Sequence, residues 1–252
     1  MAAETEIKGG AVKRVLVVIA IIIVAAIAAA AWYVNDYYRA HATALATMAD
    51  ADGDADGVVV REIDGNKAAF VPDDPKAGLI FYPGAKVQPE AYAPLLERCA
   101  EQGILCVLVR PLFNLAILDE NAAEGVQAQF PEIDTWIVAG HSMGGVAASD
   151  YASHHAGDFS AIAFLASYPT AELAEFDGDV VSVAGSNDEV LNRDNYESAR
   201  AKLPDDASEL EIAGGNHAYY GNYGEQAGDG AATITRDEQQ AQTANAIARL
   251  AA

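Results

Sequence analysis

The segment 138–145, Val-Ala-Gly-His-Ser-Met-Gly-Gly, constrains the fold more than any other part of the chain. It places Ser142 between glycines, after a run of β-forming residues and before small and apolar residues at helical spacing. A sharp turn from strand to helix strains its central residue and leaves little room for neighbouring Cβ atoms, so it requires glycines. The turn would hold Ser142 at the edge of a sheet, beside helix N–H groups that favour negative charge. We therefore predict a nucleophilic serine.

A serine hydroxyl is a poor nucleophile and needs a histidine base, itself oriented by a carboxylate. A predicted strand over 179–184 runs into a polar turn that contains Asp188, and one over 209–213 opens into a glycine-rich loop that contains His217. The order Ser142, Asp188, His217 is the order produced by one serine-hydrolase topology and not by the others. We predict that Ser142 attacks, His217 moves the proton and Asp188 orients His217.

Other carboxylates stand near Asp188, so a different acid such as Asp194 is an alternative. His141 occupies the variable position of the turn, and we interpret it as a packing residue rather than a base. For Ser142 the alternative is a small residue at a tight turn in a protein without catalytic activity.

These residues resemble those of the α/β-hydrolase superfamily. The likeness is greatest to the small group with little or no cap known as alpha/beta hydrolase fold-5, and dienelactone-hydrolase-like enzymes are more distant relatives. Segments 81–87, 140–145 and 215–224 carry the resemblance, which covers about residues 58–251. It implies an oxyanion hole formed by the backbone N–H of Met143 and that of either Ala85 or Lys86.

The remaining pattern alternates short apolar strands with helices, which predicts an α/β fold with a mostly parallel central sheet, helices on both faces and a minimal cap. The expected strands are 58–63, 68–71, 78–82, 104–109, 135–139, 161–166, 179–184 and 209–213. The expected helices are 89–102, 120–129, 143–156 and 235–250, the last opened by a capping box at Thr235. Tyr82, Phe113, Tyr219 and Tyr220 are candidate substrate-pocket residues, with burial in the core as the alternative.

Residues Val15 to Val34 form an uncharged apolar run long enough to cross the ~30 Å hydrocarbon layer of a bilayer. The preceding Lys13 and Arg14 favour a cytoplasmic N-terminus and an extracytoplasmic domain. The alternative is a secretory signal cleaved near Ala29 to Ala31, which also exports the domain. We expect a cytoplasmic segment 1–14, a membrane anchor 15–34, a stalk and acidic linker 35–57 and a hydrolase domain 58–252.

The formal net charge of −22 argues against nucleic acid binding and against the domain lying flat on lipid. Residues 52–57 copy the first half of a calcium loop, but Ile63 stands where a bidentate carboxylate is required, so we interpret them as solvated linker. Cys99 and Cys106 suit two small buried side chains, although an exported location would permit a bridge. Metal-ligand spacing and phosphate loops are absent from the sequence, so we predict no cofactor.

Together these features predict a membrane-anchored serine hydrolase that cleaves a carboxylic ester or similar acyl bond in a small-molecule substrate. An acyltransferase or thioesterase would use the same three residues. A non-catalytic binding protein on the same fold is the alternative from another class.

Overall fold

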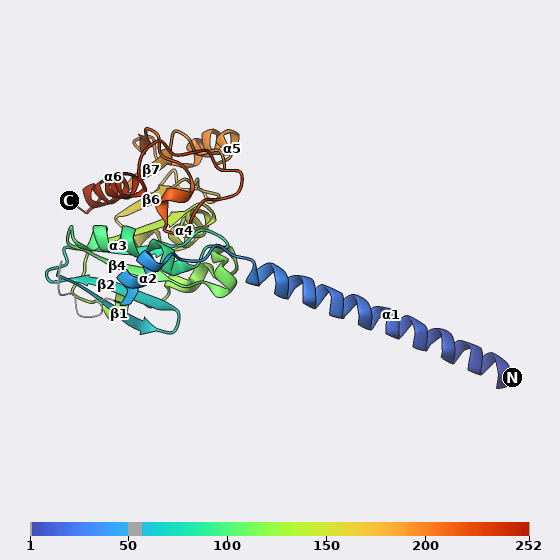
Figure 1. The fold of residues 1–252 in the computed structure, drawn as a ribbon. Helices are drawn as coiled ribbons and strands as arrows, with labels where there is room; N and C mark the ends of the chain where they lie inside the picture. The colour runs from blue at the N-terminus through green and yellow to red at the C-terminus, as the bar shows by residue number, and fades with distance from the viewer. Residues whose placement is uncertain (1, 50–56, 252) are drawn as a thin grey trace. The chain divides into compact units, whose positions relative to one another are not determined.

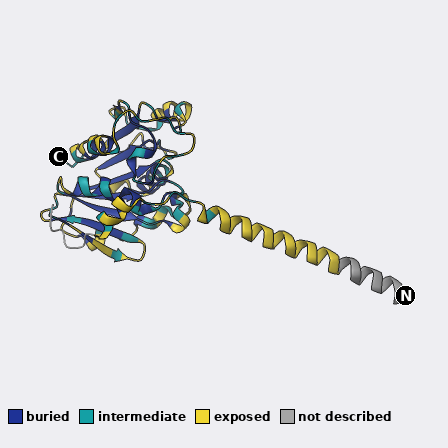
Figure 2. Cartoon of the chain, viewed as in Figure 1, coloured by how far each residue is buried: buried dark blue, intermediate teal, exposed yellow. Residues whose placement is uncertain are grey.

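The computed structural model describes residues 2–49 and 57–251 and divides the chain into two compact units, one ending at Tyr37 and the other beginning at Tyr38 (Figure 1). The first unit is a single helix, α1 (Ala2–Asn35). Its segment Lys13–Asn35 has a mean hydropathy of 3.0 and is long and apolar enough to span a membrane, and a signal sequence would meet the same criterion. None of the side chains in the most apolar part of this segment is buried, and most of the segment is drawn as exposed in Figure 2.

The second unit is built on one eight-stranded sheet, ordered β1-β2-β4-β3-β5-β6-β7-β8. The strands are β1 (Val58–Asp64), β2 (Lys67–Pro72), β3 (Ala77–Tyr82), β4 (Ile104–Val109), β5 (Trp136–His141), β6 (Ala161–Leu165), β7 (Asp179–Gly185) and β8 (Ser208–Ile212). β2 pairs antiparallel with β1 and β4, whereas every pair from β4 to β8 is parallel. The predicted α/β fold with a mostly parallel sheet is confirmed. Its loops after β3 to β8 all emerge at one edge, where α/β folds place their ligands.

Side chains alternate between the two faces of the sheet, and both faces are buried (Figure 2). Leu79 and Phe81 of β3 pack into one apolar cluster with α3 (Ala93–Ala100) and α6 (Arg236–Arg249). Ile80 and Tyr82 pack into a second cluster with α4 (Met143–His154). Burial on both faces explains why the central strands are continuous apolar runs, as is usual for parallel sheets.

The predicted capping box at the start of α6 is present. The Glu238 N–H donates to the Thr235 hydroxyl at 3.2 Å, and the Thr235 N–H donates to the Glu238 carboxylate at 2.8 Å. The two bonds satisfy two of the N–H groups that a helix start leaves unpaired. The pKa of Glu238 is lowered because the Thr235 N–H and then the Thr235 hydroxyl donate to its carboxylate.

One helix prediction was wrong, and one short helix was not predicted. The expected helix over 120–129 is a pair of 3₁₀ turns, η4 (Glu120–Ala123) and η5 (Gln127–Gln129), interrupted by Gly125 at φ 76°. A short helix, α5 (Arg193–Ala199), was not predicted. The Asn192 side chain caps it by accepting the Asn195 N–H at 2.9 Å, a local bond that is difficult to distinguish in sequence from an ordinary polar turn.

The boundary of the predicted stalk over 35–57 also differs, because residues from Tyr38 onward belong to the second compact unit. Tyr38 forms a parallel bridge with Val87, and the helix α2 (Ala42–Ala49) packs on the core, with Ala44 fully buried. The ordered domain therefore begins about twenty residues before the predicted boundary at Val58. The acidic segment 50–56, which contains most of the half calcium loop, lies outside the described residues.

Cys99 and Cys106 are both buried free thiols, and the sequence analysis interprets them as small buried side chains. Burial, followed by the neighbouring Cys99, raises the pKa of the Cys106 thiol and keeps it protonated.

Candidate active site

Ser142 lies at the sharp turn between β5 and α4, as the glycine pattern predicts. Its backbone takes φ 53° and ψ −125°, a region that costs free energy for any residue with a Cβ atom. The turn is held by two bonds: the Ser142 N–H donates to the Leu165 carbonyl at 2.9 Å, and the Gly145 N–H donates to the Ser142 carbonyl at 3.0 Å. A Cβ on Gly140 would lie 2.3 Å from backbone atoms of Gly144, so this close packing excludes a larger residue there.

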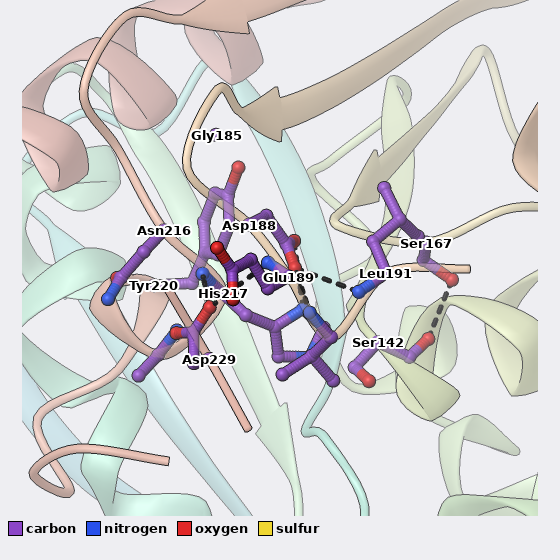
Figure 3. Close-up of polar contacts among 12 residues, drawn as sticks. Ser142, Ser167, Gly185, Asp188, Glu189, Leu191, Asn216, His217, Tyr220 and Asp229 are labelled. Carbon is purple, nitrogen blue, oxygen red and sulfur yellow. Dashed lines mark hydrogen bonds and ion pairs between the residues drawn. The ribbon is translucent and has the colours of Figure 1, made fainter. Parts of the chain in front are cut away.

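His217 and Asp188 form a buried pair at the same edge of the sheet (Figure 3). Asp188 follows β7 and His217 follows β8, and the His217 Nδ1 lies 2.9 Å from the Asp188 Oδ2. The other oxygen, Oδ1, accepts the N–H groups of Val190 and Leu191 at 2.9 and 2.8 Å. These bonds fix the direction of the carboxylate, so it can hold the imidazole in one orientation.

The remaining ring nitrogen of His217 faces no protein partner. Its Nε2 is buried and has no hydrogen-bond partner among the described residues. Ser142 and His217 both line one cavity of about 170 Å³, and Ser142 is half-buried there. A direct bond between the serine hydroxyl and Nε2 is not among the contacts of the described residues. Catalytic hydrogen bonds are often long before a substrate binds.

Two backbone N–H groups remain candidates for the oxyanion hole, one at the start of α4 and one in the loop after β3. Met143 is the first residue of α4, where N–H groups have no carbonyl of their own helix to bond. In the loop after β3, the Lys86 N–H donates to the Asn114 carbonyl at 2.8 Å, and the Gly84 N–H donates to the Tyr92 hydroxyl at 3.0 Å. Of the two alternatives that the sequence left open, Lys86 is therefore wrong as a donor to substrate. The Ala85 N–H has no partner among the described contacts and is the remaining candidate.

Three positioning residues were missed by the sequence analysis or only partly recognised. Tyr92, on η1 (Pro89–Tyr92), places its hydroxyl 2.7 Å from Nδ1 of His141. Burial, followed by the charge of His217, lowers the pKa of His141 well below its usual range, so the ring is neutral. The Asp229 carboxylate accepts the N–H groups of His217 and Ala218 at 3.2 and 2.8 Å and fixes the histidine loop. His141 belongs to the glycine motif around Ser142. No local pattern links Tyr92 or Asp229 to the site, because each acts through a contact distant in sequence.

The cavity walls come mainly from the loops after β5, β6 and β7. Met143, Val146 and Leu191 supply apolar surface, and Tyr168 and Asn192 supply polar groups. A position at the carboxyl end of a parallel strand is the only sequence signal that these residues share.

None of the four predicted pocket residues lines this cavity. Tyr82 and Tyr220 are fully buried, and their hydroxyls donate to the carbonyls of Glu120 and Val183. Tyr219 packs its ring against the Arg236 guanidinium, 4.4 Å from the ring centre. Phe113 is 51% exposed on the loop after β4. The predictions failed because the direction of a side chain at a strand end depends on the packing of both faces of the sheet.

Among the described residues, no group of three His, Cys, Asp or Glu side chains could hold a metal ion.

The strand order and the position of the strained serine after β5 are those of an α/β-hydrolase fold. Comparison with protein families identifies the chain further: residues 78–241 match the model of the alpha/beta hydrolase family, and the chain belongs to this family. A search of curated proteins gives no match.

Solved structures of the same fold include a CIB-like hydrolase from Thermoplasma acidophilum, at 13% identity and a TM-score of 0.56, covering 77% of this chain and 100% of that one. A dienelactone hydrolase from Anabaena variabilis has 13% identity and a TM-score of 0.55, covering 77% of this chain and 94% of that one. At this identity the likeness shows the fold alone. The protein is thus a member of a hydrolase family, and its substrate has to be inferred from its own site.

Proposed function

We propose that the protein is a serine hydrolase that cleaves a carboxylic ester, or a similar acyl bond, through an acyl-serine intermediate. One observation carries the proposal: Asp188 holds the imidazole of His217 through Nδ1, the Nε2 of that ring has no hydrogen-bond partner among the described residues, and His217 lines the same cavity as the strained Ser142. A buried histidine nitrogen without a partner costs free energy unless a ligand or a reacting group uses it.

In the first half of the reaction, the Ser142 hydroxyl attacks the substrate carbonyl while His217 Nε2 takes its proton. The carbonyl oxygen becomes an oxyanion, and the backbone N–H groups of Met143 and Ala85 stabilise it. The tetrahedral intermediate then expels the leaving alcohol, which receives the proton from His217. The product bound to Ser142 is an acyl ester.

In the second half, His217 removes a proton from a water molecule, which attacks the acyl-serine carbonyl. The second tetrahedral intermediate releases the carboxylic acid, and His217 returns the proton to Ser142. The buried Asp188 stabilises the imidazolium in both halves without accepting its proton.

We also propose that α1 is a retained anchor and that the hydrolase unit lies outside the cytoplasm. Lys13 and Arg14 precede the apolar segment, which favours a cytoplasmic N-terminus. Trp32 and Tyr33 stand at its other end, the position where aromatic side chains are enriched at a membrane interface.

A fluorophosphonate probe tests the proposed chemistry, because it reacts with an activated serine. We expect labelling of Ser142 in the full chain, and loss of both labelling and ester hydrolysis in Ser142→Ala, with turnover lower by a factor on the order of 10⁶. Ser153→Ala, a change on the same helix, is the matched control and keeps both. Undiminished hydrolysis by Ser142→Ala would overturn the proposal.

A further inference from the structure

Exposed apolar side chains in the hydrolase unit concentrate at one edge of the sheet. Among its described residues, five large ones lie on the loop after β4 or at the start of α4, and we call them the apolar lip: Leu112, Phe113, Ile117, Leu118 and Met143. Only Leu45 and Val59 are similarly exposed elsewhere in the described part of this unit. Single exposed apolar residues are ordinary, whereas several together mark a surface that binds something.

The loop that carries most of the lip is ordered. It forms two 3₁₀ turns, η2 (Leu112–Asn114) and η3 (Ala116–Leu118), and Ala116, the first residue of η3, is fully buried. The Leu112 N–H donates to the Asp119 carboxylate at 3.1 Å and closes the loop. Phe113 is held at φ 57°, which is unfavourable for a bulky residue. The fold thus stabilises a conformation that keeps these side chains in solvent.

The lip lies at the same edge of the sheet as the candidate active site. Its loop follows β4, and Met143 follows β5 directly after Ser142. The Lys86 N–H bonds the Asn114 carbonyl at 2.8 Å, which joins the lip loop to the loop that carries the candidate oxyanion donor Ala85. Met143 is 40% exposed and also lines the cavity, so the lip reaches the substrate site.

The chain also joins the hydrolase unit at this edge. The Tyr38 N–H donates to the Lys86 carbonyl at 2.7 Å, and the Gln88 N–H donates to the Tyr38 carbonyl at 2.8 Å. Only Asp36 and Tyr37 separate Tyr38 from the end of α1 at Asn35, and such a link spans at most about 10 Å. If α1 spans a membrane, the length of this link keeps Tyr38 within about 10 Å of the end of the spanning helix.

We propose that the apolar lip inserts into the surface of the membrane that holds α1, and that the substrate is an acyl ester dissolved in that membrane. This inference rests on the proposed function. The cavity of about 170 Å³ is smaller than most ligand pockets, so the greater part of a long acyl chain would stay in lipid. The net charge of −22 selects neutral zwitterionic headgroups over anionic ones. Insertion of the lip alone is compatible with the expectation that the domain does not lie flat on lipid.

A fluorescent label tests the docking directly in the full chain reconstituted into phosphatidylcholine vesicles. Both native cysteines are buried, so an NBD label attaches to the introduced cysteine in Leu118→Cys or in Glu101→Cys. Glu101 is the matched control, exposed just before β4 at the opposite edge. We expect nitroxide-labelled phosphatidylcholine to quench the label at position 118 and not at 101. Equal quenching at both positions overturns the proposal, as does a blue shift at 118 without quenching, which would indicate that a second protein copy covers the lip.

Hydrolysis provides the second test. For the double variant Leu112→Ser with Leu118→Ser, we expect the rate on a long-chain 4-nitrophenyl ester in vesicles to fall about tenfold relative to the rate on soluble 4-nitrophenyl acetate. Leu45→Ser with Val59→Ser is the control and keeps the native ratio. An unchanged ratio in the lip variant overturns the inference. If the native chain cleaves neither ester and is not labelled by the fluorophosphonate, the proposed function fails. The quenching experiment then still decides whether the lip inserts into the membrane.

Discussion

The hydroxyl of Tyr92 lies 2.7 Å from Nδ1 of His141 and accepts the N–H of Gly84 at 3.0 Å. His141 immediately precedes the candidate nucleophile, and Gly84 immediately precedes the candidate oxyanion donor Ala85. The space between them is fully used, because a Cβ on Gly84 would lie 2.8 Å from the Tyr92 hydroxyl and 2.9 Å from the His141 nitrogen. One phenol therefore sets the separation between the nucleophile turn and the loop that faces it.

Replacing Tyr92 by Phe removes this link and leaves two buried polar groups without a partner. We expect a loss of about 1–3 kcal/mol in the free energy of unfolding and a fall in kcat of about tenfold or more, with KM little changed, because the oxyanion donor is displaced. Steady-state kinetics and thermal unfolding provide the measurements. Tyr219→Phe, whose ring packs on Arg236 at the edge of the fold, should keep native kcat. A normal kcat in Tyr92→Phe would show that the loop holds its position without the phenol.

His141 makes the stability of the domain dependent on pH. Its pKa is lowered in the folded state, first by burial and then by the charge of His217. Above an unfolded pKa near 6.5 both states are neutral and stability is complete, whereas below it the unfolded chain binds a proton that the folded chain does not. Stability is therefore lost as pH falls through about 6.5, by about 1.4 kcal/mol at pH 5.5.

Chemical denaturation between pH 7.5 and 5 measures this effect. His141→Asn keeps a polar atom near Tyr92 but cannot be protonated, so its stability should fall less steeply over the same range. The comparison uses the slope against pH rather than the absolute stability, which the substitution itself can lower. Parallel slopes in the native chain and the variant would contradict the prediction.

Asp188 orients His217, and its loss should be less severe than loss of the nucleophile or the base. Removing the serine or histidine of such a unit costs on the order of 10⁶ in turnover, whereas removing the carboxylate costs roughly 10⁴. We expect Asp188→Asn to fall in the second class, since a neutral amide at Oδ2 no longer favours the N–H on Nδ1. Asp194→Asn tests the alternative acid of the sequence analysis. If Asp194→Asn lost turnover and Asp188→Asn kept it, the acid would have to be reassigned.

The retained anchor predicts how the protein responds to protease. In intact spheroplasts, added protease should degrade the hydrolase unit and leave a membrane fragment that contains Lys13–Asn35, because the proposed topology puts the unit outside the cytoplasm. Immunoblotting with tags at each end of the chain follows both parts, and a cytoplasmic protein serves as the control for intact cells. A soluble mature protein beginning near Trp32 would establish the cleaved-signal alternative.

Local sequence was enough to predict the elements that the structure contains around the candidate nucleophile. Gly140 is required by its contact with the backbone of Gly144, four residues away, so this part of the sharp turn between β5 and α4 is determined by nearby positions. Gly144 instead faces the backbone carbonyls of Tyr82 and Pro83, which are distant in sequence. The parallel sheet could be predicted for a similar reason, because strands buried on both faces are continuous apolar runs. The capping box of α6 depends on two residues three positions apart.

Contacts between distant segments decided the rest. Lys86 and Ala85 are indistinguishable as donors until the Asn114 carbonyl is known to bond the first of them. Tyr82 looked like a pocket residue, but packing against α4 buries it, and the approach of Tyr92 to His141 joins residues 49 positions apart. The residues 38–49 carry no strong apolar pattern, and only docking on the core distinguishes them from a stalk. The direction of a side chain and the partner of a backbone amide depend on neighbours that are distant in sequence. A local pattern of residue types does not identify those neighbours.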